Sequence, residues 1–206
     1  INLLAFDPAG NLLIAGYGTA TGAPATSGAY RAAGTGDSAP VVCKLRAVDG
    51  TPLFCTYFDD NGSGVTLLGA DSNLSVNVVM GSVLVKLDPS GSTAHLFSIP
   101  TFNLMAADNS GNTYLAGPNN SSATGGSIVE KMDSSGNVAW TSYHGGGETV
   151  TALTVDSSGQ VYLAGTPYLS PVPSLLAGFV RKLSADGSDT LWETKTSISA
   201  TWIGID

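Results

Sequence analysis

Short stretches of alternating apolar and polar residues, separated by glycine-containing turns, run along the whole chain. Thr149–Val155 alternates as a strand with one buried face does. No stretch shows the 3.6-residue apolar period of a long helix. The last complete group predicts four strands, at Thr149–Val155, Val161–Gly165, Gly178–Leu183 and Leu191–Thr196, with turns at Asp156–Gly159 and Ser184–Gly187.

Two phrases recur along the sequence at matching places in each group. The first runs from an Asp through a Gly into an apolar strand, and its copies begin at Asp7, Asp108 and Asp156, with a degenerate copy at Asp71. The second carries a lysine before an apolar residue. These lysines, 42, 45 and 51 residues apart, are Lys44, Lys86, Lys131 and Lys182. A period near ~50 residues with several strands per period is typical of propeller blades.

We therefore predict an all-β protein, a β-propeller of about four four-stranded antiparallel blades. The expected repeats span residues 1–64, 65–101, 102–149 and 150–199, and 200–206 begins another blade. The chain opens on a first-type strand at Ile1–Phe6 and closes on another at Ala200–Ile205. Because a closed four-bladed ring would then have one strand too many, we expect a segment of a longer array.

Composition limits the partners that this chain can bind. Its net charge is −8, its pI is about 4.4 and only 12% of its residues are charged. Nucleic-acid recognition needs clustered Lys and Arg, whereas the basic residues here are scattered, so nucleic acid is not expected. No stretch approaches the roughly 18 apolar residues of a membrane helix, and no membrane span is expected.

The two cysteines, Cys43 and Cys55, lie on consecutive predicted strands around the Asp49-Gly50 turn. In a hairpin centred there they fall nearly opposite each other, which makes a disulfide reachable. The alternative is two buried free thiols that pack as small hydrophobes. A disulfide would favour an oxidising compartment.

The repeat resembles the bacterial β-propeller repeat family called SBBP. The likeness rests on the Asp and Gly-Asn turn phrase, on Lys86–Gly91, on the loop Pro24–Tyr30 and on the segment Thr141–Gly147. Repeats one, three and four carry this pattern, whereas repeat two has lost the loop and the Gly-Asn turn. The resemblance implies a propeller in large secreted or surface-attached bacterial proteins, and it implies no catalytic residues.

The recurring charges have two interpretations. Lys44, Lys86, Lys131 and Lys182 could form a cationic ring for an anion, but pairing with the turn carboxylates Asp7, Asp108 and Asp156 is favoured. The Asp turns lack the distal acid of a calcium loop, so turn chemistry explains them, although several Asp on one rim could share an ion. No cofactor is expected.

Other candidate residues also have structural explanations. His144-Gly145-Gly146-Gly147 resembles an esterase oxyanion loop, but the chain has no nucleophile elbow. Trp140 and Trp192 share one phase of the repeat, which favours blade packing over a sugar platform that would also use Trp202. The variable loops Asn119–Ser122 and Tyr168–Pro173 are where function concentrates on a rigid scaffold.

The expected function is a non-catalytic, secreted or cell-surface scaffold that binds protein or glycan and could self-associate. The alternative is a lyase or hydrolase that acts on polysaccharide in the propeller channel. That alternative needs paired acids from different blades, such as Glu148 with a repeat Asp. It rests on analogy between folds, so we expect no enzyme.

Overall fold

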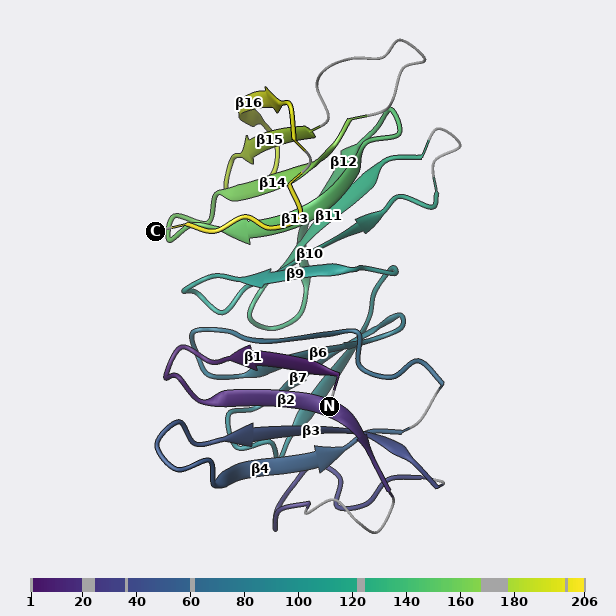
Figure 1. Cartoon of the computed structure of the whole chain (residues 1–206), viewed down its shortest axis with the longest axis vertical. Coiled ribbons are helices and arrows are strands. Elements are labelled where there is room, and N and C mark those ends of the chain that lie inside the picture. The colour runs from purple at the N-terminus through teal and green to yellow at the C-terminus, as the bar shows by residue number, and fades with distance from the viewer. Residues whose placement is uncertain are drawn as a thin grey trace. The chain divides into compact units, whose positions relative to one another are not determined.

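The computed structural model describes residues 2–19, 25–35, 37–59, 62–121, 125–167, 178–198 and 200–205. These residues form strands and turns, with no helix among them (Figure 1). The strands make four separate antiparallel sheets of four strands each, and every sheet keeps the order of the chain. This confirms the predicted all-β fold built from four-stranded blades.

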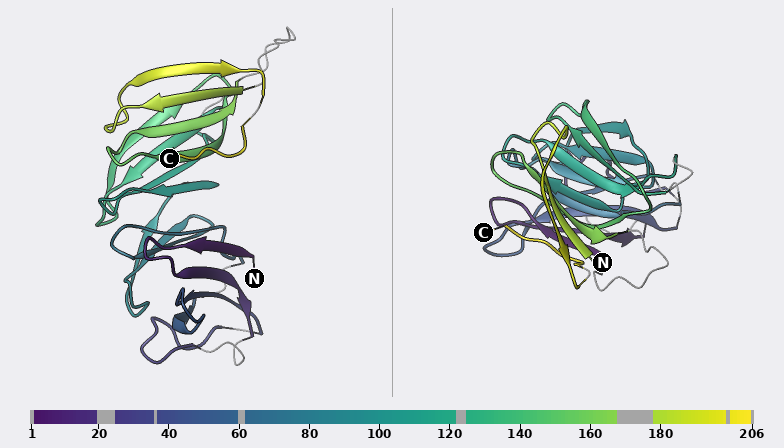
Figure 2. Two further views of the ribbon diagram at one scale, coloured as in Figure 1. Left: turned by 60° about the vertical axis from the view of Figure 1, so that its left-hand side comes forward. Right: turned by 90° about the horizontal axis from the view of Figure 1, so that it is seen from above.

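The chain divides into two compact units, Ile1–Pro100 and Thr101–Asp206, which we describe separately (Figure 2). The first unit holds the first blade, β1 (Leu3–Phe6), β2 (Leu12–Gly18), β3 (Ala39–Leu45) and β4 (Pro52–Tyr57), and the second blade, β5 (Leu67–Ala70), β6 (Val76–Met80), β7 (Val83–Leu87) and β8 (Ala94–Ser98). The second unit holds the third blade, β9 (Leu104–Ala107), β10 (Thr113–Pro118), β11 (Ser127–Met132) and β12 (Val138–His144), and the fourth blade, β13 (Thr149–Val155), β14 (Val161–Thr166), β15 (Gly178–Leu183) and β16 (Thr190–Thr196).

The turn between the first and second strand of a blade is held by its aspartate. In the first blade, the amides of Ala9 and Asn11 donate to Asp7 Oδ1 at 3.0 and 2.8 Å, and Gly10 has a φ of 81°. The second blade keeps this geometry at Asp71 without the glycine. Leu74 takes the glycine's place with a φ of 64°, a left-handed conformation that residues with a Cβ rarely adopt.

Each unit buries its core between the facing sheets of its two blades. In the first unit, Leu13, Val42 and Phe54 of the first blade pack with Val78 and Val85 of the second. In the second unit the corresponding core contains Tyr114 and Val129 of the third blade and, from the fourth blade, Val161, Leu163 and Phe179. The blades therefore depend on their neighbours for burial, as repeat units do.

An aromatic side chain on the last strand of one blade fits against a turn glycine of the next. A Cβ on Gly91 would lie 2.4 Å from the Phe54 ring, and one on Gly187 would lie 2.6 Å from the Trp140 ring. Trp140 Nε1 also donates to the carbonyl of Ala185 at 3.0 Å. This aromatic–glycine contact recurs in both units and fixes how consecutive blades meet.

One expected strand is absent. Residues 200–205 form no strand, contrary to the prediction of a further first-type strand at Ala200–Ile205. A first strand is held by the second strand of its own blade, and no such strand lies near it among the described residues. Some residues named in the sequence predictions lie outside the described residues. They are the chain ends Ile1 and Asp206, and the loop residues Pro24, Ser122 and Tyr168–Pro173.

Candidate functional site

The repeated lysines occupy one register position on the third strand of each blade, beside the turn aspartates. Lys44 Nζ lies 2.6 Å from Asp7 Oδ2, and both side chains are buried. Lys86–Asp71 and Lys182–Asp156 pairs repeat this contact at 3.6 and 3.4 Å. Although burial opposes it, hydrogen bonds from Lys44 and Asn11 hold the pKa of Asp7 below its ordinary value.

Lys131 does not follow this pattern, because Tyr114 rather than the lysine contacts the turn aspartate Asp108. The Tyr114 hydroxyl donates to Asp108 Oδ2 at 3.0 Å, and Lys131 Nζ lies 5.2 Å from the centre of the Tyr114 ring. Burial, together with the bond to Asp108, raises the pKa of the Tyr114 hydroxyl far above its usual range. The lysine positions therefore serve blade structure, and Lys44 and Lys86, which are 2% and 6% exposed, could contact a ligand only if their ion pairs opened.

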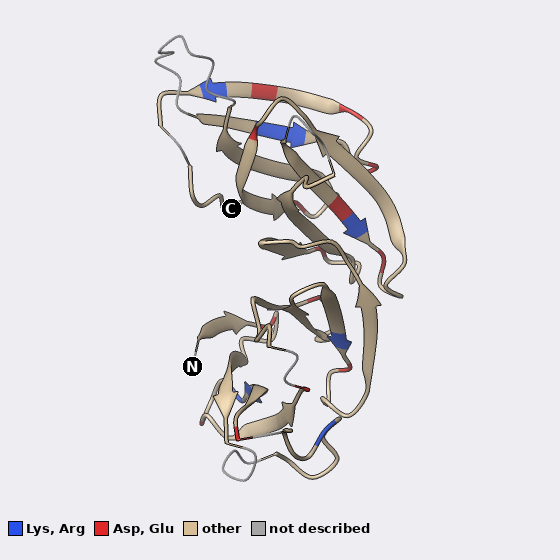
Figure 3. Ribbon diagram, turned by 90° about the vertical axis from the view of Figure 1, so that its right-hand side faces the viewer, with Lys and Arg blue, Asp and Glu red and all other residues tan. Residues whose placement is uncertain are grey.

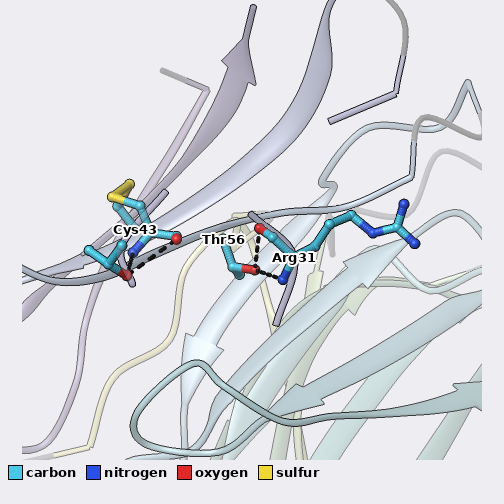
Figure 4. Close-up of a disulfide and its surroundings, with 5 residues drawn as sticks. Arg31, Cys43 and Thr56 are labelled. Carbon is cyan, nitrogen blue, oxygen red and sulfur yellow. Dashed lines mark hydrogen bonds between the residues drawn. A yellow bond between two sulfur atoms is a disulfide. The ribbon is translucent and has the colours of Figure 1, made fainter. Parts of the chain in front are cut away.

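The two cysteines form a disulfide across the β3–β4 ladder, where Cys43 and Cys55 are direct partners (Figure 4). The other edge of β4 is covered by the chain's own segment from Thr26 to Arg31. Thr26 N donates to the Cys55 carbonyl at 3.1 Å, and Arg31 N donates to Thr56 Oγ1 at 2.9 Å. The loop resembling the SBBP pattern thus closes the outer edge of the first blade.

The second unit contains a network of charges between its two blades, on the side of the outer strands. Arg181 on β15 donates to Glu148 Oε1 and Oε2 at 3.0 Å each and to Glu193 Oε2 through Nε at 2.7 Å. Arg181 Nη1 also lies 2.9 Å from His144 Nδ1. Acidic and basic segments accordingly lie on neighbouring strands in Figure 3, where most of the ribbon is uncharged.

His144 is electrically neutral in this network. Burial, aided by the positive charge of Arg181, lowers the pKa of the imidazole to about 4. His144 Nε2 is buried with no hydrogen-bond partner among the described residues. Although burial opposes it, bonds from Lys195 and Arg181 hold the pKa of Glu193 below its ordinary value. One guanidinium thus binds two carboxylates, while burial and the charge of that guanidinium keep the imidazole neutral.

This network contains Glu148, the acid that the enzyme alternative would use. The enzyme alternative needs a pair such as Glu148 with a repeat Asp. Glu148 is instead paired with Arg181, which also binds Glu193. Both carboxylates are bound by one guanidinium, so neither is free to act as an acid or base in this arrangement. The remaining glutamate, Glu130, has its pKa raised by burial.

The first unit has apolar residues at the register positions that hold this network. Val85 and Leu96 are paired as Arg181 and Glu193 are, and Phe58 follows β4 where His144 ends β12. Val83 likewise stands where Phe179 does. The smaller side chains leave a cavity of about 100 Å³, lined by Tyr30, Arg31, Phe58, Asp59, Met80, Val83, Val85 and Leu96.

The rim of this cavity carries an ion pair that the sequence did not suggest. Arg31 donates through both terminal nitrogens to Asp59, with Nη2 2.7 Å from Oδ2. Tyr30 lies beside Phe58, with ring centres 6.4 Å apart. We call the cavity and its rim the inter-blade pocket. The sequence repeats could have indicated this pocket. Aligning the repeats places Val85 at the position of Arg181, so one repeat is apolar where another is charged.

The remaining sequence candidates lie apart from this pocket. Trp192 stacks edge-on with Tyr162 and is 44% exposed, whereas Trp140 is engaged by the next blade. In the described part of the chain, no three His, Cys, Asp or Glu residues gather as metal ligands. The same residues include no helix with the length and apolarity to cross a bilayer. Asn119 N donates to the Gly126 carbonyl at 2.9 Å, which closes the β10–β11 loop.

Comparison with known proteins identifies the fold. No protein-family model matches the sequence, and no curated protein does. Similar solved structures include a mitotic checkpoint complex (13% identity, TM-score 0.60, 94% of this chain and 49% of that chain) and Sqt1 from Saccharomyces cerevisiae (11%, 0.55, 81% and 48%). A protein of unknown function from Bacteroides caccae is similar at 11% identity, with a TM-score of 0.51 over 93% of this chain and 65% of that one.

The chain therefore spans between 48% and 65% of the length of these three structures. At such low identity the likeness concerns the fold alone. The specific SBBP resemblance stays a prediction, since no family model matches. Four antiparallel four-stranded sheets and these structural neighbours together identify the fold as that of a β-propeller.

Proposed function

We propose that this chain is a non-catalytic interaction scaffold of a secreted or cell-surface protein, in which exposed blade faces bind further blades. The propeller fold and its neighbours support a role in binding protein. The span of about half of two similar chains supports the proposal that more blades take part. The disulfide and the SBBP resemblance support an oxidising, extracellular setting.

The observation that carries this proposal is the aromatic–glycine contact between consecutive blades. Phe54 and Trp140 each meet a turn glycine of the next blade. Trp192 stands at the same register position in the fourth blade, opposite Lys182, and is 44% exposed with Leu191 beside it at 48%. The fourth blade thus exposes the aromatic side of an aromatic–glycine contact, and the turn glycine of another blade would complete it.

The first blade presents the opposite half. Leu4 and Phe6 on β1 point away from the core of their unit and are 65% and 71% exposed. Gly50, in the turn of that blade, has no atom within 4 Å of a Cβ position. Exposed apolar faces of this kind mark protein-binding surfaces. The bound carboxylates of the Arg181 network favour this scaffold role over hydrolysis or lyase chemistry.

The test is self-association of the purified chain, measured by sedimentation velocity over a range of concentrations. We expect concentration-dependent assembly, because a second copy supplies the missing blade face. Trp192→Arg should weaken assembly strongly, whereas Ile198→Arg, a change at a 70% exposed residue outside the strands, should leave it intact. A wild-type chain that stays monomeric, or equal assembly by both variants, would contradict the proposal.

A further inference from the structure

The outer edge of the second blade is open, whereas the outer edge of the first is covered. In the first blade, the long β2–β3 connection supplies Thr26–Arg31, which bonds to the free edge of β4. In the second blade, the β6–β7 connection is only Gly81-Ser82. Such a short turn cannot reach the outer strand, so β8 lacks an equivalent cover from its own blade.

The direction of the backbone groups on β8 follows from its register. Ile99 N donates to the Ser82 carbonyl, and Asp88 N donates to the Thr93 carbonyl, at 2.9 and 3.0 Å. In an antiparallel ladder these bonding pairs alternate, so the amides and carbonyls of Ala94, Leu96 and Ser98 point outward. Among the described residues, no backbone segment outside the β7–β8 ladder pairs with them. An unpaired edge of this kind is a template for another strand.

The inter-blade pocket lies beside this open edge. Leu96 and Val85 on β8 and β7 form one side of the pocket, and Tyr30 and Phe58 of the first blade are among its other residues. Its volume of about 100 Å³ is far below the ~300–1,000 Å³ of pockets for drug-sized ligands, and it is below the ~150 Å³ of an apolar cavity that takes benzene. One aliphatic side chain suits this space.

The charges near β8 indicate what else the occupant carries. The Arg31–Asp59 pair neutralises itself at the rim. Asp88, in the turn that leads into β8, has no basic partner among the described residues. Although burial opposes it, hydrogen bonds from Ser90, Thr93 and Ser92 hold its pKa below the ordinary value. A basic side chain on the occupant would complement this fixed negative charge.

We propose that the open edge of β8 and the inter-blade pocket together bind an extended segment of a partner protein by strand addition. The segment inserts one aliphatic side chain into the pocket and places a basic side chain near Asp88. In this mode, main-chain hydrogen bonds provide affinity and a side-chain pocket provides selectivity. The cover over β4 shows that an extended segment fits the outer edge of a blade in this fold.

The experiment selects a library of random heptapeptides displayed on phage against the purified chain. The best peptide is then labelled, and its affinity is measured by fluorescence anisotropy. We expect enrichment of β-prone peptides with an aliphatic residue at one fixed position and Lys or Arg at another. Dissociation constants in the micromolar range are typical of such small contacts, of order 1 μM.

Two variants test the two parts of the site, and a third is their control. Ser98→Pro removes an outward amide at a residue that does not line the pocket, and it removes no ladder bond, as edge prolines do. Val83→Phe fills the pocket with the side chain that Phe179 supplies in the fourth blade. Each should weaken peptide binding by at least about tenfold, the effect of losing one anchor. Val48→Phe, at a 91% exposed turn residue, should change nothing.

The other outcomes overturn the proposal in distinguishable ways. No enrichment, or equal binding by all variants, refutes a site on β8. Loss of binding in Val83→Phe alone, with retained binding in Ser98→Pro, identifies an apolar pocket without strand addition. If sedimentation shows self-association that Ser98→Pro and Val83→Phe both abolish, the occupant is a second copy. None of these results involves Trp192, so the proposed scaffold role is tested independently.

Discussion

Replacing His144 by phenylalanine should remove a defined part of the chain's sensitivity to mild acid. The imidazole has a pKa of about 4 in the folded chain and ~6.5 when unfolded, so the unfolded state binds the extra proton between these values. Stability from the neutral histidine is therefore complete above ~pH 6.5 and is lost as the pH falls toward 4. Between pH 7 and pH 5 this amounts to about 2 kcal/mol, because one pKa unit corresponds to ~1.4 kcal/mol.

The variant is matched to the fold, since Phe58 occupies the corresponding position in the first blade. Urea unfolding followed by tryptophan fluorescence reports on the second unit, because all three tryptophans lie in it. Wild type should lose about 2 kcal/mol between pH 7 and pH 5, and His144→Phe should lose much less. Carboxylates with lowered pKa values contribute little in this range because their unfolded pKa values lie below 5. Glu130, whose pKa is raised, is present in both wild type and variant, so its contribution cancels in the comparison.

His95, the other histidine, is exposed, so His95→Gln serves as the control and should behave as wild type. Equal acid sensitivity in wild type and His144→Phe would refute the neutral histidine. A loss of stability at pH 7 in the variant would not affect the test, because each protein is compared with itself.

Three further changes test the first unit, with unfolding followed by circular dichroism. Replacing both Cys43 and Cys55 by alanine should lower the free energy of unfolding by about 3 kcal/mol, the loop entropy expected for a sequence separation of 12. Reductant should have no further effect on this variant. Lys44→Met leaves Asp7 buried without its cation and should cost about 3 kcal/mol, part of which a second change of Asp7→Asn should restore. Leu74→Gly relieves a left-handed backbone conformation and should stabilise the unit by about 1 kcal/mol; an unchanged midpoint would mean that the turn carries no strain.

The strands and turns could be predicted from sequence because they depend on local chemistry. The Asp turns form where their aspartate accepts amides two and four residues ahead, which needs only Asp and a residue that tolerates positive φ. The register followed from the repeat, because the lysines mark one position on each third strand. The second blade was hardest to delimit, since Leu74 stands where the other turns have glycine.

The inter-blade network could not be predicted in the same way. Arg181 meets His144 and Glu148 across a sequence separation of 37 and 33 residues, and nothing in the local pattern joins them. The sequence singled out Glu148 only as an acid that the enzyme alternative would need, and it gave no sign of the pairing with Arg181. The expected strand at 200–205 did not form either, although its local pattern is like that of the other first strands.

The same register position on the third strand is therefore occupied by different side chains in the second and fourth blades. Where Phe179 and Arg181 occupy it, one guanidinium binds two carboxylates and lies over the Phe179 ring. Where Val83 and Val85 occupy it, the space is partly empty and the neighbouring edge strand is open. Filling costs a blade nothing that its fold requires, because the fourth blade does it. The proposed strand addition would use both the empty position and the open edge, and Val83→Phe tests it most directly because it fills that position.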